Sequence, residues 1–235
     1  MLVHHNSRLV FVHVPATAGL SITRYLLHNR ACYVGFNGDL SMAPNGELSL
    51  RRRGYSIDSP SDNKETLADS EWSRFAVLDP KLVYRTASDI PVEYTDYENF
   101  CIVRDPLTRI ASAWAYRVRK KTRNATQEDF KGFVNFVKLL SNQFNEKKIQ
   151  PKVKLYLPQK HWVREDTRII KFENLHFDLN DLLIDRGLPE FKKHFNNNQE
   201  VKDQLGITSW YELYDEYSAQ TVREIYKEDC GLWGY

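Results

Sequence analysis

Two segments of this sequence share one pattern: a short apolar run stops at a polar loop and passes directly into a helical pattern. They are residues 9–21, LVFVHVPATAGLS, and residues 99–112, NFCIVRDPLTRIAS. An α/β fold presents anion-binding groups in such strand–loop–helix units, at the carboxyl ends of parallel strands. The pattern therefore predicts a parallel sheet with a binding site along that edge.

The bulk composition narrows the class of protein. The 235 residues are enough for one sizeable α/β core. Apolar residues make up 42% and charged residues 27%, as in ordinary globular proteins, and a formal net charge of +2 argues against a general nucleic-acid binder. No apolar run is long enough to span a bilayer, which takes about 18 residues. We expect a cytoplasmic protein, or a soluble luminal domain if a membrane stem was removed. The three cysteines lack metal-ligand spacing and mildly favour a reduced compartment.

Hydrophobic periodicity places further elements along the chain. Strands are predicted at 9–14, 100–103 and 168–172, and helices at 19–28, 105–119, 127–142, 174–186 and 215–229. Asp105 and Pro106 are favoured residues for a helix N-cap and first turn. Residues 35–70 are rich in Gly, Pro, Ser, Asn and Asp, so we expect a mobile insertion there. The predicted fold is a single α/β domain, residues 1–235, with a central parallel sheet flanked by helices.

The first loop, residues 15–21, has the character of an anion site. Gly19 permits close approach, Thr17 and Ser21 carry hydroxyls, and backbone N–H groups converge at the helix start. The loop does not match G-x-x-x-x-G-K-[ST], so neither a Mg-ATP loop nor a metal site is expected. Taken alone, it also fits an ordinary tight strand-to-helix turn.

The second loop supplies a cation. Arg104 directly follows a strand, and Ser112 lies eight positions later, about two helical turns along. A guanidinium and a hydroxyl so placed are able to hold one phosphate, although a lone arginine more often pairs with a carboxylate. Together the two loops favour a ligand with two separate phosphate-like groups.

The two motifs resemble the cofactor motifs of sulfotransferases that use 3′-phosphoadenosine 5′-phosphosulfate (PAPS), especially the carbohydrate sulfotransferase branch. Further similar stretches are 157–162 (LPQKHW), 169–175 (IIKFENL) and 222–229 (VREIYKED). The resemblance implies a P-loop-like sulfotransferase fold, PAPS as donor and PAP as product. It places the 5′-phosphosulfate on Pro15, Ala16, Thr17, Ala18, Gly19, Leu20 and Ser21, and the 3′-phosphate on Arg104 and Ser112. Trp162, or residues near it, would lie close to the adenine or the acceptor.

Position 16 departs from the family, whose loop normally reads Pro-Lys-Thr-Ala-Gly-Thr-Ser. Ala16 stands where that lysine would stabilise charge on the leaving oxygen, and Leu20 removes one hydroxyl. We predict that this chain binds the nucleotide but is weakly active or inactive. Three explanations are open: an engineered substitution, which the otherwise well-formed motif favours, a natural pseudoenzyme, or a replacement cation such as Arg24 or Lys160.

The acceptor side carries less signal. Sulfuryl transfer needs a base near the acceptor hydroxyl, and His13 and Glu71 are the candidates. His13 fits a hydrogen-bonded strand histidine equally well. Basic clusters at 51–53 and 117–123 fit either a solvated surface or a grip on an anionic polysaccharide.

The sequence as a whole indicates a PAPS-dependent sulfotransferase acting on a hydroxyl, of a carbohydrate by the resemblance. The alternatives are a non-catalytic pseudoenzyme that binds PAP or a glycan, and a P-loop nucleotide kinase that binds Mg-ATP.

Overall fold

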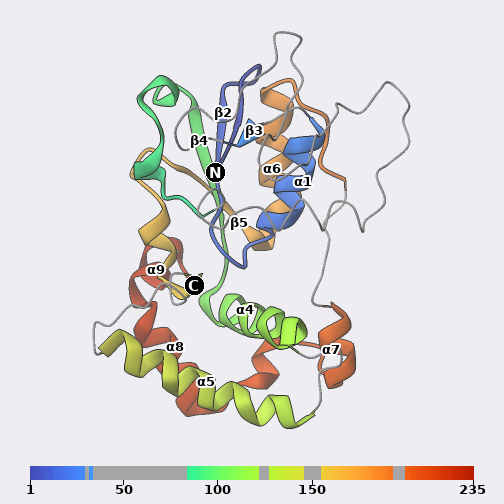
Figure 1. Cartoon of the computed structure of the whole chain (residues 1–235), viewed down its shortest axis with the longest axis vertical. Helices are drawn as coiled ribbons and strands as arrows, with labels where there is room; N and C mark the ends of the chain where they lie inside the picture. Colours follow the sequence, from blue (N-terminus) through green and yellow to red (C-terminus); the bar gives the residue numbers. More distant parts are fainter. Residues whose placement is uncertain (30–31, 34–83, 122–126, 146–154, 193–198) are drawn as a thin grey trace, which may run out of the picture.

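The structure is a computed structural model, which describes residues 1–29, 32–33, 84–121, 127–145, 155–192 and 199–235 (Figure 1). The insertion expected at 35–70 lies outside these ranges. So do the base candidate Glu71, the basic cluster at 51–53 and the end of the cluster at 117–123.

Within the described residues the sheet has the strand order β3-β1-β2-β4-β5. Its strands are β1 (Leu2–His4), β2 (Leu9–Val12), β3 (Cys32–Tyr33), β4 (Glu98–Val103) and β5 (Arg168–Lys171). β2, β4 and β5 are parallel, as predicted, whereas β1 runs antiparallel to both of its neighbours. The α/β fold class with a central parallel sheet is confirmed, and the structure adds an antiparallel edge formed by β1 and β3.

The register brings the predicted loops to one edge of the sheet. Val12 pairs with Cys101, and Cys101 pairs with Ile169. Because these three strands are parallel and in step, the segments after Val12, Val103 and Lys171 emerge side by side. The candidate site therefore lies at this carboxyl edge.

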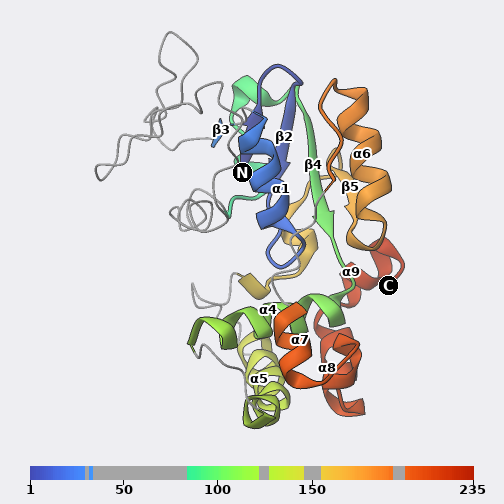
Figure 2. The same ribbon diagram turned by 90° about the vertical axis from the view of Figure 1, so that its right-hand side faces the viewer.

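The two faces of the sheet are covered differently. Helices α1 (Gly19–His28) and α6 (Leu175–Asp185) pack on one face, where Phe11, Ile22 and Leu179 share a buried cluster (Figure 2). On the other face Val12 and Val103 pack against short 3-10 turns, η1 (Ala87–Asp89) and η4 (Gln159–Trp162). Trp233, the last residue of helix α9 (Lys227–Trp233), also packs against this second cluster.

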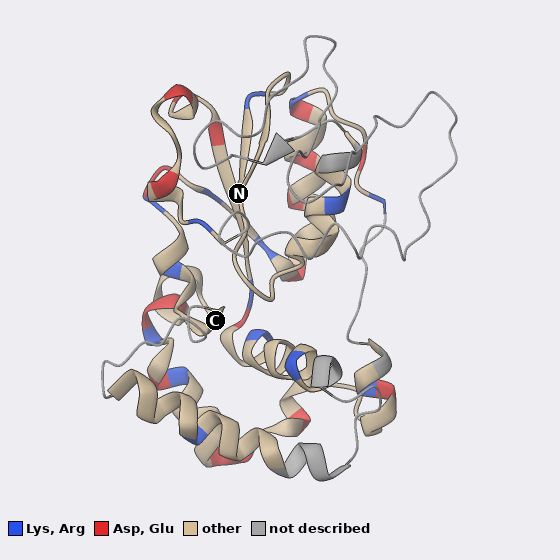
Figure 3. Cartoon of the chain, in the orientation of Figure 1, with Lys and Arg blue, Asp and Glu red and all other residues tan. Residues whose placement is uncertain are grey.

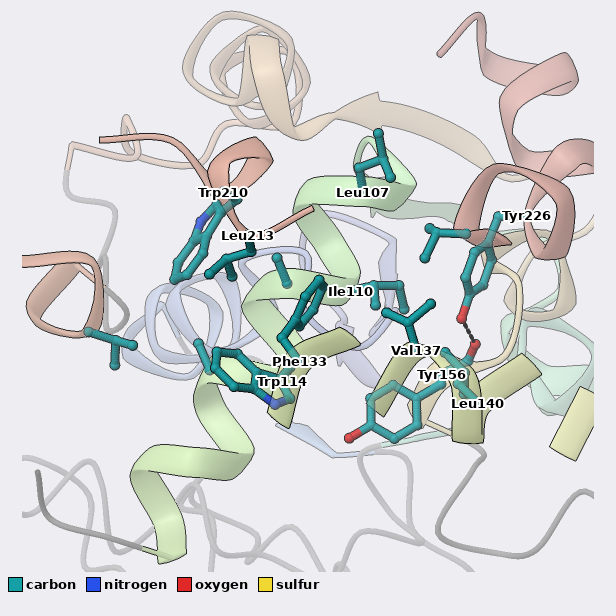
Figure 4. Packing of buried hydrophobic residues seen from close by; sticks show 14 of the residues in the cluster. Leu107, Ile110, Trp114, Phe133, Val137, Leu140, Tyr156, Trp210, Leu213 and Tyr226 are labelled. Carbon is teal, nitrogen blue, oxygen red and sulfur yellow. Dashed lines mark hydrogen bonds between the residues drawn. The ribbon is translucent and has the colours of Figure 1, made fainter. Parts of the chain in front are cut away.

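A helical layer lies beyond the carboxyl edge (Figures 1 and 2). It consists of α4 (Pro106–Lys121), α5 (Gln127–Asn145), α7 (Gln199–Leu205), η6 (Trp210–Leu213), α8 (Glu216–Ile225) and α9 (Lys227–Trp233). Trp114 of α4 and Phe133 of α5 pack edge to face, with ring centroids 5.3 Å apart, in the core of this layer (Figure 4). Since only Arg104 and Asp105 separate β4 from α4, this core fixes the second loop against the sheet.

The single helix predicted at 215–229 is wrong, because the chain breaks at Tyr226 into α8 and α9. Tyr226 is fully buried, and its hydroxyl donates a hydrogen bond to the carbonyl oxygen of Tyr156 (Figure 4). Helix α7 was not predicted. No helix in the described part of the chain is both long and apolar enough to cross a membrane.

Candidate functional site

The first loop presents a row of backbone N–H groups at the start of α1. Ala16 and Ala18 both have φ 64°, the left-handed region that non-glycine residues seldom adopt. Among the described residues, the N–H groups of residues 16–20 have no hydrogen-bond partner, whereas those of Ser21 and Ile22 bond the Ala18 carbonyl. Alternating left-handed residues at a helix N-terminus turn N–H groups toward a common point and so form an anion-binding concavity.

The hydroxyl of Thr17 closes this turn. Thr17 is fully buried, and its Oγ1 donates to the carbonyl oxygen of Val14 at 2.8 Å. Its hydroxyl hydrogen is therefore used within the protein, and its main-chain N–H is the group left for a ligand. Ser21 is likewise buried, at 2% exposure.

His13 packs against the loop from within the fold. A Cβ added to Gly19 would lie 1.8 Å from Nε2 of His13, so only glycine fits there. The His13 ring also stacks on Phe11 and meets Tyr84. Burial lowers the pKa of His13 to about 3. A histidine with so low a pKa is neutral and accepts a proton poorly, so this environment favours a packing role over that of a base.

Arg104 sits at the end of β4 as a nearly buried cation. Its Nε donates to Thr108 Oγ1 at 3.0 Å, and the guanidinium carbon lies 4.2 Å from the centre of the Phe172 ring. The two terminal nitrogens have no hydrogen-bond partner among the described residues. Burial lowers the pKa of Arg104 to about 10, so the group remains charged at neutral pH. A desolvated guanidinium with unused donors is suited to an oxyanion.

Helix α4 brings Ser112 to the same side. Asp105 caps the helix, since its Oδ2 accepts the N–H of Thr108 at 2.8 Å. Thr108, which Arg104 contacts, and Ser112 are four residues apart and so share one helix face, one turn from each other. Arg104 and Ser112 thus belong to one region of the carboxyl edge.

Acidic and aromatic side chains surround Arg104 without forming an ion pair with it among the described residues. Glu173 accepts the N–H of Asp105 at 3.0 Å and the hydroxyl of Tyr235 at 2.9 Å. Tyr211 donates to Asp105 Oδ2 at 3.0 Å, and burial and that carboxylate raise the pKa of Tyr211 to about 12. These contacts join the ends of β4 and β5 to the helical layer and favour the charged form of Arg104.

Three buried polar residues of the site were missed by sequence reasoning. All three lie within stretches of similarity, but none of them was given a role. All three have 0% exposure. Arg109 offered a usable signal, because it lies between Leu107 and Ile110 on the apolar face of a predicted helix. A charge in such a place must find partners inside the protein.

The structure locates the other proposed participants. Trp162 is 2% exposed and belongs to the core of the sheet, and its indole N–H has no partner in the described part of the chain. Lys160 forms an ion pair with Glu228. Arg24 is half-buried on α1 and has contacts of its own. The described lysines and arginines lie among aspartates and glutamates on both the sheet and the helical layer (Figure 3).

Two concavities, of about 400 and 560 Å³, lie apart from these loops. One is lined by the β1–β2 turn and residues 186–188, the other by α6 and residues 190–192. No cluster of His, Cys, Asp and Glu able to hold a metal ion occurs among the residues that were placed.

The fold is that of an α/β protein with two loops at the carboxyl edge of its parallel strands, one with unpaired N–H groups and one with a nearly buried guanidinium among the described residues. A family model described as "Sulfotransferase family" matches residues 1–235, and the chain belongs to this family. Its general activity class is thus sulfuryl transfer. A comparison with curated proteins and one with solved structures each found no match.

Proposed function

We propose that this chain binds PAPS and its product PAP, with the 5′-phosphosulfate on residues 15–21 and the 3′-phosphate on Arg104 and Ser112. The observation that carries the proposal is Arg104: a charged, nearly buried guanidinium whose terminal nitrogens have no described partner. It stands at the same sheet edge as the unpaired N–H groups of the first loop. Two anion sites on adjacent parallel strands suit a ligand with two phosphate-like groups.

The proposed reaction is in-line transfer of SO₃ from PAPS to an acceptor hydroxyl. A new bond forms between sulfur and the acceptor oxygen while the bond to the bridging oxygen of the donor breaks, and the acceptor proton passes to a base. The chain's contribution is to hold the donor with its N–H groups and Arg104. Backbone N–H donors fixed in this way stabilise developing negative charge without reorganising.

Ala16 argues against efficient sulfuryl transfer, although it does not argue against nucleotide binding. A methyl side chain supplies no charge to the leaving oxygen, and Lys160 is already paired with Glu228. Loss of one electrostatic group commonly lowers a rate by a factor on the order of 10²–10³. We therefore infer nucleotide binding with weak or absent turnover.

The two alternative functions are a non-catalytic binding protein and a nucleotide kinase. Ala16 favours a non-catalytic protein that binds PAP or a glycan, since the fold and the anion loops do not require lysine at position 16. A nucleotide kinase would prefer Mg-ATP, and the first loop lacks the lysine and the hydroxyl pattern of that class.

Calorimetry with PAP, 5′-AMP and Mg-ATP tests the proposal. We expect PAP to bind more tightly than 5′-AMP, because only PAP carries the 3′-phosphate. Arg104→Ala should abolish that preference, whereas Arg223→Ala, at an exposed position on α8, should keep it. Tighter binding of Mg-ATP than of PAP would contradict the proposal and support a kinase.

The acceptor that we propose is a hydroxyl group of a carbohydrate. The support is the similarity of the two motifs to the carbohydrate branch, together with Arg117, an exposed residue near the end of α4 whose positive charge would attract an anionic glycan. Incubation with PAPS and a panel of desulfated and sulfated glycans, followed by mass analysis, tests this choice. Sulfate appearing only on a phenol or a peptide would contradict it.

A further inference from the structure

The side chain of Gln159 holds the backbone of Arg104 at both of its polar groups. Its Oε1 accepts the N–H of Arg104 at 2.9 Å, and its Nε2 donates to the Arg104 carbonyl at 2.8 Å. Gln159 has no exposed surface. The side-chain amide of Gln159 therefore makes two hydrogen bonds with the backbone of Arg104, as a neighbouring strand would.

Asp229 in turn holds Gln159. Its two carboxylate oxygens accept the N–H groups of Gln159, at 2.7 Å, and Lys160, at 3.0 Å. Asp229 is also fully buried, on helix α9, and its charge is attractive to the buried guanidinium of Arg109. A buried carboxylate satisfied in this way orients the turn that carries Gln159.

The location of these bonds matters because the sheet ends just before Arg104. Val103 is the last residue of β4 and pairs with Lys171, whereas Arg104 lies beyond the ladder. Among the described residues no other group bonds the N–H or carbonyl of Arg104, so without Gln159 both would lack a partner there. The direction of the side chain would then depend on its contacts with Thr108 and Phe172. Binding a phosphate through a guanidinium fork depends on that direction.

We propose that Gln159, held in place by Asp229, is the positioning residue that aims Arg104 at the 3′-phosphate of the nucleotide. This inference rests on the proposed function, and it assigns Gln159 no contact with the ligand. Glutamine suits the role because it offers one donor and one acceptor at once, whereas glutamate at neutral pH offers acceptors only.

The test compares two ligands that differ only in the 3′-phosphate. Gln159→Met keeps the length and volume of the side chain but removes both hydrogen bonds to Arg104. We expect the dissociation constant for PAP to rise about tenfold, the effect of losing a well-directed charged contact. Binding of 5′-AMP should change less than about twofold, because the first loop is held by other contacts. The preference for PAP over 5′-AMP is the readout, since a merely structural role would weaken both ligands alike.

A matched control separates positioning from general destabilisation. Val137→Ala removes buried volume in the helical layer, from a residue with 0% exposure and no bond to Arg104. It should lower stability yet leave the ligand preference unchanged. If Gln159→Met fails to fold, Gln159→Glu is measured instead. It keeps the acceptor for the Arg104 N–H, loses the donor, and should also reduce the preference.

The outcomes distinguish this inference from the function on which it rests. A wild-type chain that prefers PAP, with Gln159 variants that keep the preference, overturns the positioning role alone. A wild-type chain that binds PAP no more tightly than 5′-AMP overturns the proposed function and the inference with it. Asp229→Asn retains one acceptor oxygen, so it should reduce the preference for PAP over 5′-AMP less than Gln159→Met does. If Asp229→Asn has the same preference as the wild-type chain, the role given to Asp229 is contradicted.

Discussion

The guanidinium of Arg109 donates a hydrogen bond of 3.0 Å from Nε to the carbonyl oxygen of Pro15. Pro15 opens the first loop and Arg109 lies on α4 of the second motif, so one bond joins the two motifs. The same side chain donates through Nη2 to the carbonyl oxygens of Leu157, at 3.0 Å, and Leu155, at 3.2 Å. A single buried cation therefore links both loops to the segment that carries Gln159.

Replacing Arg109 by lysine should destabilise the fold even though the charge is kept. An ammonium group carries its three N–H donors on one nitrogen, so it cannot span the three carbonyls that two separate nitrogens of the planar arginine fork reach. Buried acceptors left unpaired cost about 1–3 kcal/mol each, so we expect the free energy of unfolding to fall by roughly 2–4 kcal/mol. Urea denaturation measures this loss. The control is Arg223→Lys at an exposed position on α8, which should stay within about 0.5 kcal/mol of wild type.

Gly19→Ala should be damaging because of His13. The new Cβ would lie 1.8 Å from His13 Nε2, and the ring is confined by Phe11 and Tyr84. Overpacking of this kind costs about 1–3 kcal/mol, and a shift of the loop would also weaken PAP binding. Thermal unfolding and calorimetry with PAP measure the two effects.

A glycine in open surroundings provides the matched control. Gly132, within α5, has no atom within 4 Å of an added Cβ, so Gly132→Ala should stabilise the helix by about 0.5–1 kcal/mol. The double variant Gly19→Ala with His13→Ala tests the cause. If the clash is with the imidazole, the two substitutions will be strongly non-additive, whereas simple additivity would assign the damage elsewhere.

The imidazole of His13, half-buried between Phe11 and Tyr84, should make the fold sensitive to acid. Its pKa is about 3 in the folded chain, lowered by burial from an ordinary 6.5, so the unfolded chain binds the proton more readily. Stability is therefore fully present above about pH 6.5 and is lost as the pH falls toward 3. Within that window His13 contributes a slope of about 1.4 kcal/mol per pH unit.

Urea denaturation at several pH values between 7 and 4 measures that slope. In His13→Gln we expect the dependence on pH to be shallower by this amount, whatever the change in absolute stability. Other groups with lowered pKa values, His4 and the amino group of Met1, are common to both chains and cancel in the difference. Parallel curves for the two chains would contradict the burial of a neutral His13.

The centre of the sheet and its two loops were predictable because their signals are local. Apolar runs mark β2 and β4, and Asp105 with Pro106 marks the start of α4. Strands β1 and β3 were missed because three and two residues carry no periodicity, and their pairing depends on partners elsewhere in the chain. The break at Tyr226 was missed for a similar reason, since its hydroxyl bonds Tyr156, which lies 70 residues earlier.

The candidate site also contains residues that the sequence predicts and residues that it does not. Residues 15–21 and Arg104 follow strands, so their position at the sheet edge was predictable from parallel topology. The residues that hold them in place were not, because each acts across the sequence: Gln159 on Arg104, 55 residues away, and Arg109 on Pro15, 94 residues away. The base remains a prediction for Glu71, and the surroundings of His13 favour packing.

Restoring lysine at position 16 separates a disabled enzyme from a binding protein. Ala16 already has φ 64°, and lysine meets the same backbone restriction as alanine, so Ala16→Lys should fold with similar stability. If the chain is a disabled enzyme, the rate of PAP release from PAPS should rise by a factor on the order of 10²–10³, with water or a glycan as acceptor. Ala16→Met is the matched control: it adds a chain without a charge and should leave the rate unchanged. Unchanged turnover in Ala16→Lys, with PAP binding intact, would assign the chain a binding role, because the missing cation would then not be what limits transfer.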